Sequence, residues 1–468
     1  MNDLNKKVDM PLRNPIERNK CFKEVSLGYT KEMAIKEANR CLHCKNKPCV
    51  KGCPLNIDVE GFVALVSKGD FFEAYKKIKE TNLMPAVCGR VCNQENQCER
   101  VCIRGIKGEA ISIGRLERFV ADWARENKVD EIEIDIKNNN KKVAIVGSGP
   151  SSLACAKNMR IYGYDVTVFE ALHVAGGVLM YGIPEFRLPK EIVNREIELL
   201  KNMGIKIKTN MVIGKIFSID DLLNDGYSAV YIGAGAGLPR FMGIEGENAN
   251  GVYSANEFLT RVNLMKAYDF PKHDTPVRIN KKVAVVGGGN VAMDVARVAK
   301  RLDASEVYVV YRRSEAEMPA RREEIEHAKE EGIIFRLLEN PKRIIKNNDG
   351  EVCAIECVNM ELTGVDEKGR RKVKEIQGSE HQIEVDTVIM SIGQSPNNLI
   401  TNETPEIEIE KFGGIRINEE TKQSTKEGVF AGGDIVTGAA TVTLAIKMGK
   451  EAAEAMHEYI NEKEGKNI

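Results

Sequence analysis

Two short runs of cysteine stand out near the start of the chain. Eight of its twelve cysteines lie in these runs: Cys41, Cys44, Cys49 and Cys53, then Cys88, Cys92, Cys98 and Cys102. Thiolates bind soft iron or zinc well, and short spacings allow several of them to converge on one inorganic centre. The first run has proline directly after its last cysteine and resembles the ferredoxin signature with a longer middle gap. The spacing therefore predicts two [4Fe-4S] clusters.

Zinc is the main alternative to iron at these thiols, although structural zinc sites usually show closer, paired spacings. Disulfides are disfavoured, because they need an oxidising compartment and the polar start of the chain, Met1 to Lys7, predicts no export signal. The sequence also contains no apolar run of the length that a membrane span requires. We therefore expect a cytoplasmic protein with reduced thiols and no membrane segment.

A dinucleotide-binding pattern follows the cysteine runs. A buried strand over 142–146 leads into a glycine turn and an apolar helix, and Glu170 ends the strand after that helix. Gly147 allows the tight turn, and Gly149 lets the backbone approach a pyrophosphate at the helix N-terminus. Glu170 is then placed to hold a ribose hydroxyl. The predicted contacts of this unit are Gly147, Ser148, Gly149, Pro150 and Glu170.

The same pattern recurs after a strand over 282–286, with predicted contacts at Gly287, Gly289, Asn290 and Val291. Its second strand, 306–311, is followed by Arg312 and Arg313, where the first unit has its acid. Guanidinium groups bind a 2′-phosphate that a carboxylate would repel, so this unit favours NADPH over NADH. A basic strand end that only faces solvent is the alternative. Arg321 and Arg322 could join the phosphate site or face solvent.

A third glycine turn lies near the C-terminus, where a short strand leads into Gly433 and Asp434, and Thr441 precedes an amphipathic helix. Asp434 can accept a hydrogen bond from a ribityl hydroxyl, and the helix N-terminus would face the pyrimidine edge of a flavin. The block therefore predicts FAD, and it indicates that the chain returns to the first nucleotide domain after an inserted second one.

These motifs require a mixed α/β fold, in which a helical N-terminal iron–sulfur domain precedes two Rossmann-like nucleotide-binding domains, the second inserted into the first. The expected ranges are 1–138 for the cluster domain, 140–278 and 396–468 for the FAD-binding domain, and 279–395 for the NADPH-binding domain. With 68 basic and 69 acidic side chains, the composition gives no indication of nucleic-acid binding.

The order of these motifs resembles the flavin disulfide-reductase superfamily, and the whole chain resembles the small, NADPH-oxidising subunit family of glutamate synthase. Related proteins are the NADP-binding subunit of the electron-bifurcating NADH-dependent ferredoxin:NADP oxidoreductase and the N-terminal half of dihydropyrimidine dehydrogenase. The resemblance rests on both cysteine runs and on residues 83–92, 113–118, 147–150, 183–189, 287–294 and 431–434.

The resemblance implies that the ligand sets cross between the two cysteine runs. One cluster would be held by Cys41, Cys44, Cys49 and Cys102, and the other by Cys53, Cys92, Cys98 and Glu117. Dihydropyrimidine dehydrogenase has a glutamine at the position of Glu117, and a carboxylate is a harder iron ligand than a thiolate. Without the resemblance, Glu117 would be interpreted as a surface acid paired with Arg115 or Arg118. Cys88 is left without a role.

The resemblance further implies that Arg187 contacts the FAD, that Gly177 and Val178 pass close to it, and that Thr441 lies at its pyrimidine edge. Arg312 and Arg313 would bind the 2′-phosphate. No catalytic residue is expected, because hydride transfer between two rings needs proximity and orientation more than an acid or base.

The activity implied is electron transfer from NADPH through FAD and two [4Fe-4S] clusters to a partner. In glutamate synthase that partner is a larger subunit, which makes glutamate from 2-oxoglutarate and glutamine. The alternative is a bifurcating enzyme, whose partners would be a small flavin and [2Fe-2S] subunit and ferredoxin. A subunit that only relays electrons is a third possibility, and two complete nucleotide motifs argue against it.

Overall fold

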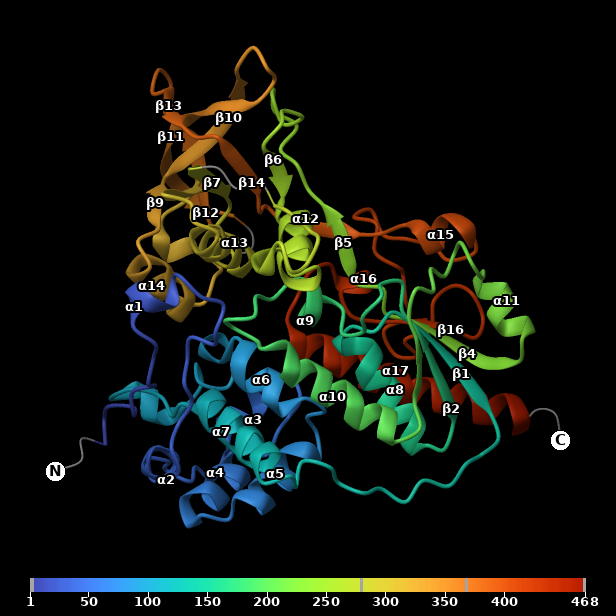
Figure 1. Cartoon of the computed structure of the whole chain (residues 1–468). Helices are drawn as coiled ribbons and strands as arrows, with labels where there is room; N and C mark the ends of the chain where they lie inside the picture. Colours follow the sequence, from blue (N-terminus) through green and yellow to red (C-terminus); the bar gives the residue numbers. More distant parts are fainter. Residues whose placement is uncertain (1–3, 278–280, 367–368, 466–468) are drawn as a thin grey trace.

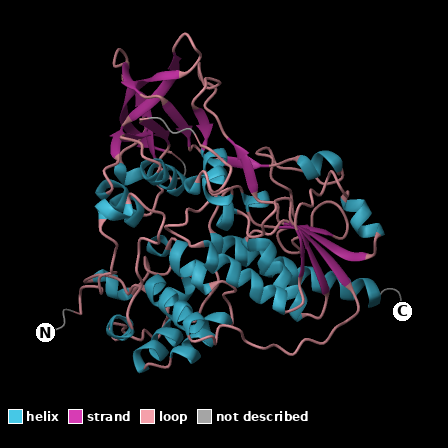
Figure 2. Cartoon of the chain, in the orientation of Figure 1, coloured by secondary structure: helices cyan, strands magenta, loops and turns pink. Residues whose placement is uncertain are grey.

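The structure is a computed structural model that describes residues 4–277, 281–366 and 369–465. It has three parts. In Figure 1 the helical N-terminal part lies at the lower left, one parallel sheet lies at the right, and a second sheet unit lies above the helical part. Figure 2 shows that the strands gather into these two separate groups, with helices between and below them.

The N-terminal part is built from short helices. They are α1 (Pro15–Arg18), α2 (Lys31–Ala38), α3 (Pro48–Lys51), α4 (Val59–Lys68), α5 (Phe71–Lys79), α6 (Pro85–Val91) and α7 (Ile113–Glu126), with 3₁₀ turns η1 (Gln94–Asn96) and η2 (Ile103–Ile106). The longest, α7, buries Leu116, Val120 and Ala124 at four-residue spacing, as expected of one helical face. The ring of Phe119 on α7 packs edge-on against that of Phe71 at 5.0 Å.

The first sheet is parallel and has the strand order β16-β4-β1-β2-β3. Its strands are β1 (Lys142–Val146), β2 (Asp165–Phe169), β3 (Lys206–Lys208), β4 (Tyr227–Ile232) and β16 (Val429–Ala431). Strand β16 pairs with β4 although the whole second sheet lies between them in sequence. The predicted fold class, with one nucleotide-binding unit inserted into the other, is therefore confirmed.

The second sheet is also parallel, with the order β6-β14-β7-β8-β9. Its strands are β6 (Val252–Ser254), β7 (Lys282–Val286), β8 (Glu306–Tyr311), β9 (Ile334–Leu337) and β14 (Thr387–Met390). An antiparallel sheet of β10 (Glu339–Lys346), β11 (Val352–Val365), β12 (Arg371–Glu375) and β13 (His381–Glu384) stands beside it, and β5 (Ala236–Pro239) pairs with β15 (Gln394–Pro396). Strand β6 belongs to this sheet although it precedes the expected boundary at 278/279, which lies outside the described residues.

The remaining helices cover the two parallel sheets. They are α8 (Pro150–Ile161), α9 (Val178–Tyr181), α10 (Lys190–Asn202), α11 (Ile219–Asn224), α12 (Ala255–Leu259), α13 (Asn290–Arg301), α14 (Arg322–Glu330), α15 (Leu399–Glu403), α16 (Asp434–Thr437) and α17 (Val442–Gly465), with short turns η3 (Thr260–Leu264), η4 (Ala267–Asp269) and η5 (Glu315–Glu317). Across the described ranges we find no helix with the length and apolar character needed to cross a membrane.

Candidate functional site

Four cysteines from both runs surround one cavity in the N-terminal part. They are Cys41, Cys44, Cys49 and Cys102, and the rest of the lining is mostly apolar, including Val63, Ile111 and Ile113, with the charged residues Lys47, Glu60 and Arg104 also present. Burial, followed by the neighbouring thiols of Cys102 and Cys41, raises the pKa of Cys49 to about 11. Four thiols around an apolar cavity have the donor chemistry that a [4Fe-4S] cluster needs. The structure thus brings together the first predicted ligand set.

The second predicted ligand set also lies together, and its cysteines are buried. Burial raises the pKa of Cys53, and it raises that of Cys92 to about 12; the carboxylate of Glu117 adds to both shifts, so the three groups lie within electrostatic range. Burial also raises the pKa of Cys98 well above its ordinary value, and the carboxylates of Glu99 and Glu117 add to this shift. Three buried thiols and one buried carboxylate are a donor set that an iron cluster could use.

Glu117 is a buried acid. Its position on an amphipathic helix did not allow this burial to be predicted from the sequence. Only 5% of its surface is exposed, and its Oε1 accepts a hydrogen bond from the Asn82 side chain at 2.6 Å. Burial raises its pKa to about 8. The alternative of a surface acid paired with a neighbouring arginine is therefore wrong.

Cys88 lies in the same neighbourhood as Glu117. Its thiol is fully buried and donates to Asn82 Oδ1 at 3.6 Å, so Asn82 contacts both candidate fourth ligands. Among the residues that the structure describes, no three His, Cys, Asp or Glu side chains converge on the position of a single metal ion. Cys88 thus lies beside the second predicted ligand set, which does not include it.

A contact that sequence reasoning missed joins the second ligand set to α17. The Sγ of Cys92 lies 3.7 Å from Thr443 Oγ1 and 3.0 Å from Gln97 Oε1. Gln97 Nε2 donates to Thr443 Oγ1 at 3.3 Å. The oxygen of Thr441 lies 3.3 Å from that of Thr443 and accepts from the backbone of Leu444. The predicted flavin edge and the predicted cluster ligand therefore meet at the start of one helix.

The first glycine turn has the close approaches that its motif predicts. Gly147 has φ +89°, and a Cβ there would lie 2.6 Å from the carbonyl oxygen of Gly233. Gly177 has φ +54°, and its Cβ would lie 2.8 Å from the Cα of Gly149. A Cβ at Gly149 itself would meet no atom within 4 Å. The turn thus has room above Gly149, at the N-terminus of α8, where a pyrophosphate is expected.

Polar groups surround this turn. Glu170 accepts hydrogen bonds from the Ser148 hydroxyl and from the backbone N–H of Leu172. Asp434, beside Gly433, is partly buried, which raises its pKa to about 6, and it accepts from the backbone of Ala440 at 3.2 Å. The acid, the turns and the start of α17 fit the ribose, pyrophosphate and ring of a flavin nucleotide.

The second glycine turn repeats this geometry. A Cβ at Gly287 would lie 2.3 Å from the Ser391 carbonyl oxygen, whereas a Cβ at Gly289 would make only an ordinary contact, 3.9 Å from Pro319 Cγ. The oxygen of the Asn290 side chain accepts from the backbone of Arg321, and Val291 is exposed at the start of α13.

The strand register refines the position of the two arginines. Val286 pairs with Val310 as Val146 pairs with Phe169, so Tyr311 occupies the place of Glu170, and the arginines come one and two residues later. Arg312 is exposed, and Arg313 Nε donates to the Arg371 carbonyl oxygen at 2.8 Å. Both cations therefore lie just beyond the strand end, and their contact with a 2′-phosphate stays a prediction.

The side chain of Arg187 contacts the second nucleotide-binding unit. Its Nη1 donates to both carboxylate oxygens of Asp294, at 2.8 and 2.9 Å, and its Nε lies 3.1 Å from Glu324. Burial raises the pKa of Asp294 to about 6, against the effect of the arginine. The predicted contact between Arg187 and FAD thus stays a prediction, and Val178 begins the short helix α9 just before this segment.

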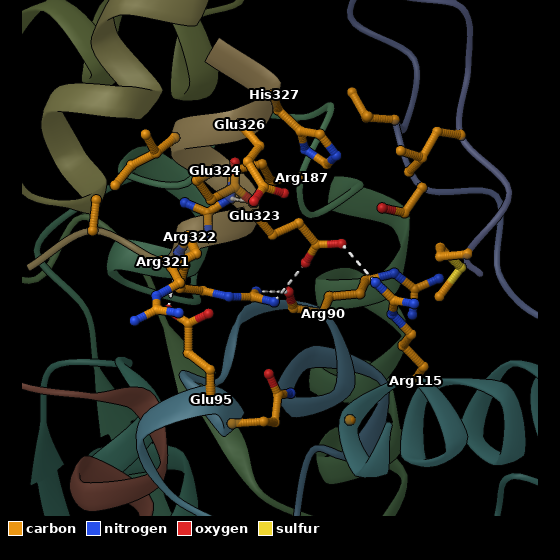
Figure 3. A pocket seen from close by; sticks show the side chains of 18 of the residues that line it. Arg90, Glu95, Arg115, Arg187, Arg321, Arg322, Glu323, Glu324, Glu326 and His327 are labelled. Atoms are coloured by element: carbon orange, nitrogen blue, oxygen red, sulfur yellow. Dashed lines mark hydrogen bonds and ion pairs between the residues drawn. The ribbon is translucent and has the colours of Figure 1, made fainter. Parts of the chain in front are cut away.

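A polar cavity of about 1130 Å³ separates the helical part from α14. Figure 3 shows Glu323 between Arg321 and Arg115, at 2.8 and 3.5 Å. Arg321 also donates to the carbonyl oxygen of Arg90 at 2.9 Å, and the backbone of Arg322 donates to Glu95. Arg321 therefore points to the helical part, which the sequence alone did not indicate.

Comparison with known proteins gives matches along the whole chain. Residues 18–129 match the family model described as dihydropyrimidine dehydrogenase domain II, 4Fe-4S cluster, and residues 141–449 match that of pyridine nucleotide-disulphide oxidoreductase. The small chain of NADPH glutamate synthase from Escherichia coli is 37% identical over 461 residues, which covers 97% of each chain.

Two further matches are relevant. The beta subunit of the NADP(+)-dependent formate dehydrogenase from Moorella thermoacetica is also 37% identical, over 89% of this chain and 60% of its own length. The structure of Mycobacterium tuberculosis FprA in complex with NADPH superposes with a TM-score of 0.58 at 20% identity, over 69% of this chain and 86% of FprA. This last likeness concerns the fold.

Proposed function

The chain belongs to the pyridine nucleotide-disulphide oxidoreductase family and is an NADPH-dependent FAD and iron–sulfur oxidoreductase. Because it also matches the small chain of glutamate synthase over 97% of its length, we propose that it supplies electrons for glutamate synthesis from 2-oxoglutarate and glutamine. The reaction itself would take place on a larger partner subunit. We further propose that the protein is cytoplasmic, because cysteines that are to bind iron must stay reduced and not form disulfides.

The observation that best supports an electron-transfer role is the contact between Cys92 and Thr443. It places a candidate cluster ligand against the helix whose first turn is expected to face the flavin. Bound FAD would supply the conversion between the two-electron chemistry of NADPH and one-electron transfer, and the two ligand sets would hold the iron–sulfur clusters that carry single electrons toward the partner.

The residues of the chain itself have binding and positioning roles in this proposal. The absence of close neighbours at Gly149 and Gly289, where a Cβ would meet no atom nearer than 3.9 Å, lets two pyrophosphates approach two helix N-termini. Glu170 holds a ribose hydroxyl of the FAD, and Arg312 and Arg313 select NADPH by its 2′-phosphate. The first ligand set, Cys41, Cys44, Cys49 and Cys102, and the second, Cys53, Cys92, Cys98 and Glu117, hold the two clusters.

The partner decides between the proposed function and its rival, so the test is to isolate the native protein anaerobically and identify the proteins that co-purify with it. A large subunit with a glutamine amidotransferase domain, and NADPH-dependent glutamate formation by the complex, is the expected result. A small flavin and [2Fe-2S] subunit would instead indicate electron bifurcation with ferredoxin, and the glutamate assignment would be withdrawn.

A further inference from the structure

Thr443 provides a hydroxyl group at the ligand set of Cys92 from a different part of the chain. The threonine is 2% exposed and lies in the first turn of α17, more than 300 residues after the cysteine in sequence. Cys92 is 7% exposed, so both polar atoms of this contact are shielded from water. A buried hydroxyl is retained at low cost only where it has hydrogen-bond partners.

The hydrogen-bond directions change when Cys92 binds iron. As a free thiol, Cys92 donates to Gln97 Oε1. As an iron ligand it has lost its proton and can only accept a hydrogen bond. The Thr443 oxygen has two lone pairs, which can accept from Gln97 Nε2 and from the Thr441 hydroxyl 3.3 Å away, so that the Thr443 proton is available for the sulfur. Gln97 Oε1, which has no bond to the deprotonated sulfur, must then move away from it, while the donors run from Gln97 Nε2 through Thr443 to Cys92 and each bond polarises the next.

A hydrogen bond to a ligand sulfur has a defined effect on iron chemistry. The reduced cluster has one more negative charge than the oxidised cluster, so a donor at the sulfur stabilises the reduced state more and raises the reduction potential. The cavity formed by the other four cysteines has no serine or threonine among the described residues that line it. Among the described residues, a hydroxyl group thus lies beside a sulfur of the second ligand set, whereas none lines the cavity of the first.

We propose that the Thr443 hydroxyl is a positioning group that raises the potential of the cluster held by Cys92, and so favours entry of electrons from the flavin side. The proposal rests on the ligand sets given above. The step concerned is a one-electron reduction: the cluster gains one electron from flavin reduced by NADPH, and the proton of Thr443 remains on its oxygen. No bond to the protein forms or breaks.

The test compares three variants of the full-length protein, purified anaerobically with its cofactors. T443V removes the hydroxyl at nearly constant volume, T443S keeps it, and T387V makes the same change at a fully buried threonine in β14, whose hydroxyl has no hydrogen-bond partner in the structure. The measurement is a redox titration of both clusters followed by electron paramagnetic resonance, with iron and acid-labile sulfide analysed in each sample.

The expected result is a lower potential for one cluster in T443V, with the other cluster unchanged, and wild-type potentials in T443S and T387V. Unchanged potentials in T443V, or an equal shift in T443S, would overturn the proposal, because packing and not the hydroxyl would then matter. If T443V loses a cluster, T443A is titrated instead, and loss of the cluster there too would mean that the hydroxyl retains the cluster and does not tune it. Since the titration needs no partner, its result is independent of the glutamate synthase assignment.

Discussion

A buried ion cluster fixes the N-terminal segment to the second nucleotide-binding unit, and replacement of its central acid should destabilise that junction strongly. Glu331 is fully buried and accepts five hydrogen bonds from the guanidinium groups of Arg18, Arg297 and Arg301, at distances from 2.6 to 3.1 Å. The substitution E331Q removes the charge at constant shape and leaves three buried cations with fewer partners.

The expected magnitude follows from this burial. Breaking a buried pair by removing one partner costs about 3–5 kcal/mol, because the remaining charge is left uncompensated. The matched control is the neighbouring acid Glu330, whose side chain is 47% exposed and which contacts Arg18 alone in this cluster, at 2.7 Å. Water can solvate the half-exposed Glu330 carboxylate, and Arg18 keeps its bond to Glu331, so E330Q should cost much less than E331Q.

Hydrogen exchange of the backbone amides in α13 and α14 measures the local opening free energy of this junction. A loss of about 3 kcal/mol corresponds to a roughly hundredfold faster exchange at these amides. Burial alone would raise the pKa of Glu331, but Arg297 and Arg301 outweigh it and hold the pKa below the ordinary value of 4.5. The stabilisation is therefore complete above about pH 4.5 and is lost as the pH falls below it. Equal exchange rates in E331Q and E330Q would refute this reasoning.

Three further predictions concern the cofactors. In R312A/R313A the affinity for NADPH should fall at least about tenfold, the loss expected for one charge-assisted hydrogen bond, while NADH affinity stays constant in stopped-flow titrations; unchanged NADPH affinity would contradict the assignment. In E117A the iron and sulfide content should fall to that of one cluster, whereas C88A should keep both, and the reverse pattern would make Cys88 the ligand. G149A should fold normally, because its Cβ meets no protein atom within 4 Å, but it should lose FAD absorbance, because that Cβ would occupy the space expected for the pyrophosphate. G147A should also lower the melting temperature, since its Cβ would lie 2.6 Å from a backbone oxygen. Equal stability of the two variants would be inconsistent with this geometry.

Local patterns predicted the parts of the fold that depend on adjacent residues. The strand, glycine turn and helix around Gly147 and Gly287 have fixed spacings, because a βαβ unit allows few others. The return of the chain to the first sheet at Val429–Ala431 was predicted from a third glycine turn. The antiparallel sheet beside β9 was not predicted, since its strands have no motif that indicates a partner.

Contacts between distant segments were harder to predict from the sequence. Glu117 lies on an amphipathic helix, and only the packing of α6 against α7 decides that this position is buried. Thr443 was not recognised, because nothing near it in sequence indicates a cysteine as its neighbour. The side chain of Arg187 pairs with Asp294 across the two nucleotide-binding units, an arrangement set by how the units dock. Such contacts depend on tertiary packing, which spacing does not encode.

The pairing of β16 with β4 determines the order in which the two nucleotide-binding units can fold during translation. Because β16 follows the inserted unit, the first sheet lacks its edge strand, and its flavin turn lacks Asp434, until the ribosome has translated the entire second sheet. The inserted unit, by contrast, has all its strands between Val252 and Met390 and can fold earlier. A nascent chain should therefore acquire its NADPH-binding fold before it can retain FAD. Since Thr441 directly precedes α17 and Thr443 lies in its first turn, the predicted flavin site and the predicted cluster site of Cys92 would both be completed in one late step.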